Sequence, residues 1–128
     1  MSEQTIRVLI ADDDRSIRRL LRMLLTDADG IVAIAEAENG EEAVEMTEQL
    51  RPDVVLVDST MPRLDIVDAV RLIRAREANV GIVVLASYDQ RAAEALEAGA
   101  NAYILKDAER EALLETIRRV ASQPPKTD

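Results

Sequence analysis

Four charged residues of this sequence follow short apolar runs, and together their side chains could perform chemistry. They are Asp12, Asp13, Asp58 and Lys106. The runs 8–11, 54–57 and 102–105 lack the polar alternation of half-exposed strands, which is typical of buried parallel strands. Open α/β folds bind their ligands at the carboxyl ends of such strands. We therefore expect three carboxylates and one ammonium group to meet at one edge of a sheet.

This combination of charges predicts a metal and a phosphoryl group. Crowded carboxylates repel one another, and a divalent cation relieves that repulsion. A ligand set made only of oxygen, with positions left for water, favours Mg²⁺ over zinc or copper. Phosphoryl transfer needs mainly positioning and charge neutralisation. Asp58 is the candidate acceptor, because carboxylates form acyl phosphates, and Lys106 can neutralise a phosphoryl oxygen.

Each of these residues also has a simpler interpretation. Asp13 or Asp14 would cap the helix that follows the first apolar run. Asp58 would be a capping or solvated loop residue, and Lys106 an ordinary surface lysine. We favour the site because the four charges coincide with three strand ends.

Five apolar runs alternate with five amphipathic segments. The strands are expected at 6–12, 31–37, 54–58, 82–85 and 102–105. The helices are expected at 15–28, after a capping signal at Asn39 and Glu42, at 66–77, at 90–98 and at 108–121. This alternation predicts an α/β fold, a three-layer sandwich of the flavodoxin-like (βα)5 type with parallel sheet order 2-1-3-4-5. That order places the first and third strands side by side and brings their aspartates together.

The first helix shows its expected faces most clearly. The apolar side chains at helical spacing are Ile17, Leu20, Leu21, Leu24 and Leu25. The arginines that occupy much of the other side are Arg15, Arg18, Arg19 and Arg22. We interpret these arginines as a solvated face, with a docking surface as the alternative. Further along the chain, Asp65 is expected to cap the third helix, and Gly99 to end the fourth in a left-handed conformation.

Composition excludes several classes of function. The 128 residues carry a net charge of -9, whereas a domain that binds nucleic acid needs a basic patch. Because the chain has no His and no Cys, it has no zinc site of the usual kind, no thiol nucleophile and no disulfide. We see no signal peptide or membrane-spanning stretch, so a cytoplasmic location is expected. Residues 1–122 are expected to form one domain, and 123–128 a linker start or a frayed terminus.

The motifs resemble those of the receiver domain of bacterial response regulators over essentially the full length. They are Asp12-Asp13, the segment Asp58-Ser59-Thr60-Met61-Pro62, and Lys106. The segments 85–89 and 103–108 are most similar to the LuxR/NarL-type transcription factors. The resemblance implies a regulatory phosphoacceptor rather than an enzyme, with at most self-catalysed transfer and autodephosphorylation.

The resemblance also implies roles and partners. A sensor histidine kinase would phosphorylate Asp58, and Lys106 would pair with the phosphoryl group. Asp13, Asp58 and the backbone carbonyl of Thr60 would ligate Mg²⁺, with Asp12 assisting through water. Phosphorylation would shift the population between two arrangements and change a surface, with a homodimer as the expected product. The output would be a DNA-binding domain outside this chain.

Three positions concern the output switch, the residues that would convert phosphorylation into the changed surface. Ala86 stands where the family usually has a threonine or serine that follows the phosphoryl group. Ser87 is adjacent, but a shift of one residue along a strand points to the opposite face. Tyr103 falls where the family keeps a rotating aromatic side chain, and a plain packing role is the alternative. The predicted acceptor chemistry is therefore complete, whereas the predicted switch lacks its hydroxyl.

Other functions stay open at this point. A stand-alone receiver would bind a protein target directly. A pseudo-receiver would act as a fixed interaction module without phosphate, and Ala86 supports that alternative. A magnesium-dependent phosphatase on the same fold is least favoured, because no separate general acid or base is evident.

Overall fold

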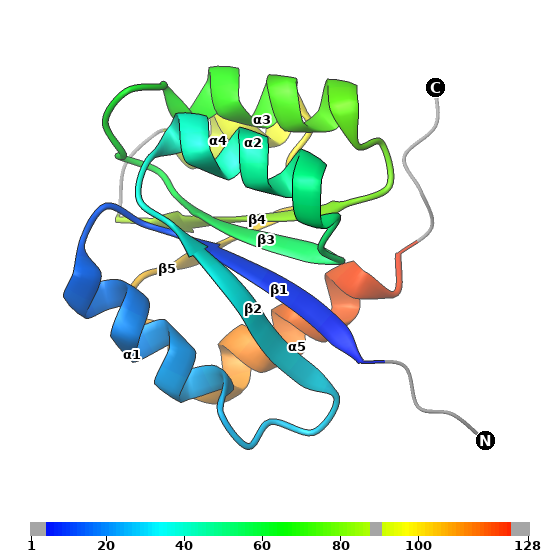
Figure 1. The fold of residues 1–128 in the computed structure, drawn as a ribbon. Helices are drawn as coiled ribbons and strands as arrows, with labels where there is room; N and C mark the ends of the chain where they lie inside the picture. Colours follow the sequence, from blue (N-terminus) through cyan, green and yellow to red (C-terminus); the bar gives the residue numbers. More distant parts are fainter. Residues whose placement is uncertain (1–4, 88–90, 124–128) are drawn as a thin grey trace.

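The computed structural model describes residues 5–87 and 91–123, and these form a parallel sheet between two layers of helices (Figure 1). The strands are β1 (Ile6–Ala11), β2 (Ile31–Ala37), β3 (Val54–Asp58), β4 (Gly81–Ala86) and β5 (Ala102–Leu105). The helices are α1 (Arg15–Leu25), α2 (Gly40–Leu50), α3 (Ile66–Arg76), α4 (Arg91–Ala98) and α5 (Arg110–Ala121). The strand order is β2-β1-β3-β4-β5, so the predicted flavodoxin-like topology is confirmed.

Alternation along each strand divides the core between the two helical layers. Val8 and Ile10 of β1 pack with the side chains of α1 and α5, whereas Leu9 packs with those of α2, α3 and α4. The central strands β3 and β4 are buried on both faces, as their continuous apolar runs predict. Figure 1 shows the two layers, with α1 and α5 below the sheet and α2, α3 and α4 above it.

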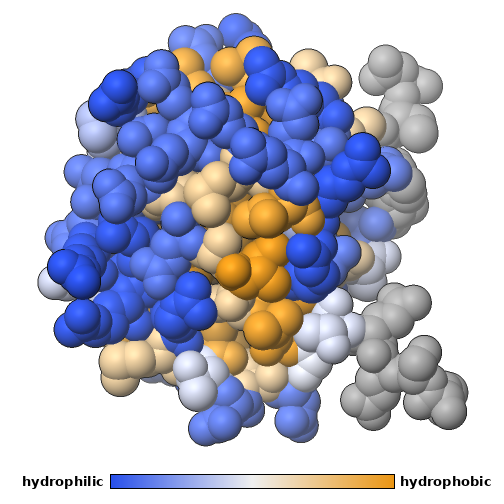
Figure 2. Space-filling view, in the orientation of Figure 1, coloured by the Kyte–Doolittle hydropathy of each residue, from blue (hydrophilic) through white to orange (hydrophobic). Residues whose placement is uncertain are grey.

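The edge strand β2 is less covered than the centre of the sheet. Val32 is an exposed apolar residue of this strand. Figure 2 shows apolar surface gathered over this part of the molecule and surrounded by hydrophilic side chains. Within the described residues, no helix is long and apolar enough to cross a membrane.

Strand register brings the expected site residues to one edge. Ala11 pairs with Val57 in the β1–β3 ladder, so the residues that follow, Asp12 and Asp58, emerge together. On the other side of β3, Asp58 pairs with Leu85 of β4. The ladder continues to β5, where the backbone N–H of Lys106 donates to the carbonyl of Ala86 at 2.9 Å. The carboxyl ends of four neighbouring strands thus converge.

Helix ends differ from the predictions where polar turns intervene. The first helix was expected to run to residue 28, but it ends at Leu25, because Thr26 is extended and Asp27 takes a φ of 63°. The last helix begins at Arg110 rather than at 108. The start of the fourth helix at 90 lies outside the described residues, and the observed helix begins at Arg91.

Capping interactions explain where three helices begin. The side chain of Asp14 accepts from the N–H of Ser16 at 2.8 Å and caps α1, so the capping alternative applies to Asp14. Asn39 caps α2 and Asp65 caps α3, as predicted. Gly99 takes a φ of 128° at the end of α4. Because Asp14 caps α1, the carboxylates of Asp12 and Asp13 remain available for other contacts.

Candidate functional site

Three carboxylates meet at the carboxyl edge of the sheet. The side chains of Asp12, Asp13 and Asp58 each place an oxygen within 4.8 Å of the others. Asp12 and Asp58 are only 1% exposed, whereas Asp13 is exposed. Two buried acids beside a third require a positive partner, because charge buried without compensation is costly.

Lys106 supplies one positive charge. Its Nζ forms an ion pair with Oδ1 of Asp58. Burial acts to lower the pKa of Lys106, but the hydrogen bond and the charge of Asp58 outweigh it, so that the pKa is raised. The lysine therefore stays protonated, and it can neutralise negative charge on the Asp58 side chain.

Asp12 is the uncompensated member of the cluster. Its Oδ1 accepts from the N–H of Asp14 at 2.9 Å, but its buried Oδ2 has no hydrogen-bond partner among the described residues. Burial, with the charges of Asp58 and Asp13, raises the pKa of Asp12 to about 6, although the Asp14 N–H and Lys106 oppose this shift. Buried polar atoms almost always have a partner, so a cation fits the chemistry of this oxygen.

The loop after β3 carries the other predicted ligand. Thr60 is exposed, and its Oγ1 lies 3.4 Å from Oδ2 of Asp58, a long contact for a hydroxyl donor. Arg63 takes a φ of 76°, in the region that favours glycine. Gly40 allows α2 to begin against this loop, because a Cβ there would lie 2.7 Å from the Cβ of Leu64. The loop thus packs against the start of α2.

Of the three switch positions, Ala86 and Ser87 lie at the end of β4, and Tyr103 lies within β5 opposite Val84. Ala86 is buried at the last position of β4, opposite Leu105 of β5. Ser87 is exposed and lies beyond the strand. Tyr103 is 50% exposed, while its neighbours Ala102 and Ile104 pack into the core beside α5. The ring of Tyr103 is therefore not a core residue, and its role as a switch stays a prediction.

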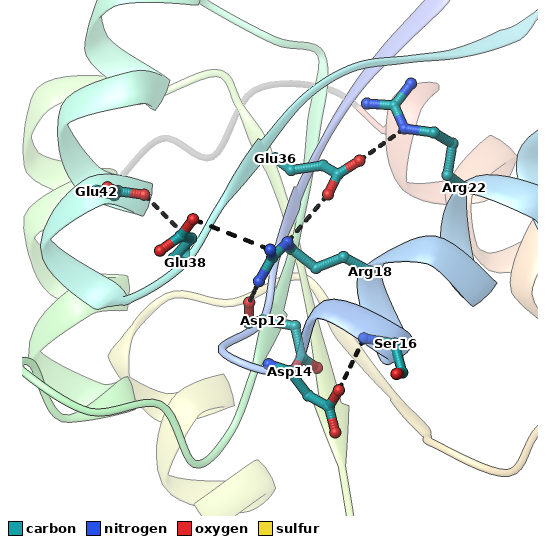
Figure 3. Close-up of polar contacts among 8 residues, drawn as sticks. All are labelled: Asp12, Asp14, Ser16, Arg18, Arg22, Glu36, Glu38 and Glu42. Atoms are coloured by element: carbon teal, nitrogen blue, oxygen red, sulfur yellow. Dashed lines mark hydrogen bonds and ion pairs between the residues drawn. The ribbon is translucent and has the colours of Figure 1, made fainter.

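Sequence reasoning missed one buried residue beside the cluster, Arg18. It was expected on a solvated face, but it is only 8% exposed and its Nη1 donates to the carbonyl of Asp12 at 2.8 Å (Figure 3). Helical spacing could have found it, because Arg18 precedes the buried Leu21 and Leu25 by three and seven residues. Leu20, which was expected in the core, is instead 47% exposed.

Comparison with known proteins decides the family. The family model described as "Response regulator receiver domain" matches residues 8–118. The chain belongs to this family. It is thus the receiver domain of a two-component response regulator, and its acidic cluster fits a phosphoacceptor site.

Relatives of this receiver domain include a transcriptional regulatory protein and a chemotaxis protein. It is 38% identical over 113 residues to the uncharacterized transcriptional regulatory protein YhcZ of Bacillus subtilis, covering 87% of this chain and 53% of that protein. It is also 38% identical over 117 residues to the chemotaxis protein CheY of Thermotoga maritima, covering 90% of this chain and 97% of that protein. The chain therefore spans about half the length of YhcZ and nearly all of CheY.

A solved structure supports the similarity to the LuxR/NarL-type subgroup. A LuxR-family two-component response regulator from Aurantimonas sp. SI85-9A1 superposes with a TM-score of 0.86 at 28% identity, covering 93% of this chain and 86% of that one. The fold and the predicted LuxR/NarL-type resemblance are thus confirmed together.

Proposed function

We propose that this receiver domain accepts a phosphoryl group on Asp58 from a sensor histidine kinase and thereby controls a DNA-binding output domain. The observation that carries the proposal is the arrangement around Asp58. A buried carboxylate pairs with Lys106 on one side and lies beside two further carboxylates on the other. No packing or capping role explains three converging acids, one of which retains a buried oxygen that has no partner among residues 5–87 and 91–123.

Mg²⁺ would be held by Asp12, Asp13 and Asp58 together with the backbone carbonyl of Thr60, with Asp12 acting through water. When bound, the cation would neutralise the clustered carboxylates and the oxygens of the incoming phosphoryl group. The unpartnered Oδ2 of Asp12 supports this ligand set. The exposed Asp13 leaves the cluster open to solvent on one side, where a phosphodonor can enter.

The residues of the chain account for the transfer. A carboxylate oxygen of Asp58 attacks phosphorus as the P–N bond of the kinase phosphohistidine breaks, and the imidazole leaves with the electron pair of that bond. Lys106 already pairs with Asp58, so it is in place to neutralise a phosphoryl oxygen. The fixed backbone of β3 holds the acceptor in position, which is the main requirement of phosphoryl transfer.

The partners of the domain follow from its family and its charge. The kinase would supply the phosphoryl group, and phosphorylation would favour a homodimer. With a net charge of -9, the domain would leave DNA contacts to its output partner. The absence of cysteine is compatible with the reducing cytoplasm, where we place the protein.

A second candidate is a stand-alone receiver that binds a protein target directly. The similarity to CheY over 97% of that protein favours it, because CheY matches the receiver with almost no additional length. Sequencing the gene beyond Asp128 separates the two: a helix-turn-helix segment supports the transcriptional role.

The test of phosphorylation uses the purified chain, Mg²⁺ and acetyl phosphate as the donor. We expect intact mass spectrometry to show the gain of one phosphoryl group. Excess chelator should prevent the gain, because the carboxylates then repel the donor. No gain with both Mg²⁺ and donor present would contradict the proposal and favour a fixed interaction module.

Ala86→Thr is expected to strengthen the coupling between phosphorylation and dimerisation, by about fivefold. A hydroxyl at the end of β4 would gain a hydrogen bond only in the phosphorylated state, and a differential contact shifts a conformational equilibrium. Sedimentation of each variant in the phosphorylated and the unphosphorylated state measures the effect. Ala86→Val is the matched control, since valine has the shape of threonine without the hydroxyl. Equal coupling in both variants would count against the missing-hydroxyl argument.

A further inference from the structure

Arg18 joins α1 to the residue that follows β1 and to the end of β2. From α1, its Nη1 donates to the carbonyl of Asp12 at 2.8 Å, and its Nε donates to Oε1 of Glu36 at 3.0 Å. Its Nη2 lies 4.0 Å from Oε2 of Glu38, just beyond β2. Figure 3 shows the guanidinium between these acceptors. A guanidinium presents its donors in a rigid plane, so contacts on several sides define its orientation.

The contact to Asp12 completes the support of that residue. Its backbone N–H donates to the carbonyl of Ala37 at 3.1 Å, and its Oδ1 accepts from Asp14. Arg18 holds the remaining backbone group, the carbonyl. With these three groups occupied, only Oδ2 is left without a partner within the described part of the chain. The local structure thus fixes Asp12 and leaves one of its carboxylate oxygens available.

Glu36 in turn holds the guanidinium. Its second oxygen, Oε2, accepts from Nε of Arg22 at 2.7 Å, so both carboxylate oxygens are engaged. The hydrogen bond from Arg22, followed by that from Arg18, lowers the pKa of Glu36 although burial opposes the shift. The carboxylate is therefore charged at neutral pH, and its bonds to the arginines are charge-assisted.

We propose that Arg18 is a positioning residue of the magnesium site, which holds the backbone of Asp12 so that Oδ2 stays aimed at the cation. Glu36 is its orienting partner on β2. The inference rests on the proposed function, because it assigns a supporting residue to the same site. Groups that orient metal ligands without touching the metal commonly change affinity by about 10- to 100-fold when removed.

Arg74 provides a matched control for a purely structural role. It is also a partly buried arginine that donates to backbone carbonyls, at 2.9 Å to Gly99 and at 2.6 Å to Val80. These carbonyls precede β5 and β4, at the opposite edge of the sheet from the acidic cluster. Loss of Arg74 should therefore lower stability without affecting the metal ligands.

The experiment compares Arg18→Met and Arg74→Met with the wild type. Calorimetric titration with Mg²⁺ alone is done at a temperature where circular dichroism shows each chain to be folded. We expect the Kd of Arg18→Met to rise about tenfold and that of Arg74→Met to stay unchanged. Arg18→Lys should recover part of the affinity, since lysine can reach one acceptor but cannot bridge two.

A second measurement needs no metal. Because Asp14 donates its N–H to Asp12, loss of Arg18 should speed amide exchange at Asp14 in the metal-free chain, whereas loss of Arg74 should not. If Arg18→Met does not fold, Glu36→Gln replaces it, and a smaller rise in Kd is expected because the charge that orients Arg18 is removed.

The possible failures are distinguishable. A wild type that binds Mg²⁺ with the same Kd as Arg18→Met, or as Glu36→Gln where that variant replaces it, would overturn the inference and leave the proposed function intact. An equal loss of Mg²⁺ affinity in Arg74→Met would also overturn the inference, because the loss would then follow from lower stability of the fold. A wild type without any Mg²⁺ binding would overturn the proposed function and this inference with it.

Discussion

Asp58→Asn is expected to gain no phosphoryl group under conditions in which the wild type gains one. The asparagine side chain has nearly the same shape, but its amide lacks the charged oxygen that attacks phosphorus. The substitution also removes the ion pair with Lys106 and one of the three carboxylates that would hold Mg²⁺. The loss should therefore be complete, and a time course of intact mass with acetyl phosphate and Mg²⁺ measures it.

The chain offers a control on the same strand. Asp53 precedes β3 at its other end, where its Oδ2 accepts from the N–H of Arg7 at 2.8 Å. Asp53→Asn removes one negative charge like Asp58→Asn, but far along the strand from the cluster. It should be phosphorylated as the wild type is. A phosphoryl group on Asp58→Asn would show that the acceptor is another residue.

Asp12→Asn is expected to raise the free energy of unfolding of the metal-free chain by about 2 kcal/mol above pH 6. Burial raises the pKa of Asp12 from 3.8 to about 6, aided by the charges of Asp58 and Asp13. One pKa unit corresponds to about 1.4 kcal/mol, and part of the cost is recovered by relaxation of the site. Asparagine removes the charge, while its Oδ1 can still accept from Asp14.

The sign of the pH dependence follows from the raised pKa. In the wild type, the protonated carboxyl favours the folded state, and this stabilisation is lost as the pH rises through about 6. The difference between variant and wild type should thus be small near pH 4 and reach its full value above pH 6. Urea unfolding at a series of pH values, without metal, measures it.

With added Mg²⁺, the wild type should instead become more stable than Asp12→Asn. A cation that binds the folded wild type stabilises it by mass action, and Asp12→Asn loses one of the charges that attract it. Asp13→Asn serves as the comparison, because the exposed Asp13 carries less of the burial cost. If the free energies of unfolding of Asp12→Asn and wild type changed with pH in parallel, the proposed cost of burying a charged Asp12 would be contradicted.

Much of this architecture could be read from the chain alone. Continuous apolar runs separated by amphipathic segments imply parallel strands with helical crossovers, and right-handed crossovers leave few sheet orders. Because a parallel strand delivers its next residue to a common edge, the positions of Asp12, Asp58 and Lys106 in the sequence were sufficient to predict that they converge. The structure confirms that convergence.

Other features depended on how the elements pack. Periodicity alone placed Arg18 on the solvated side of α1, but the adjoining strands supply it with a carbonyl and a carboxylate, so it is buried. Whether Asp13 or Asp14 caps α1 depended on the turn after β1. The position of Asp12 likewise depends on a neighbour distant in sequence, because its backbone N–H donates to the carbonyl of Ala37. Residue type and spacing indicate which groups are available, whereas three-dimensional packing decides which of them are satisfied and which remain free to bind a cation.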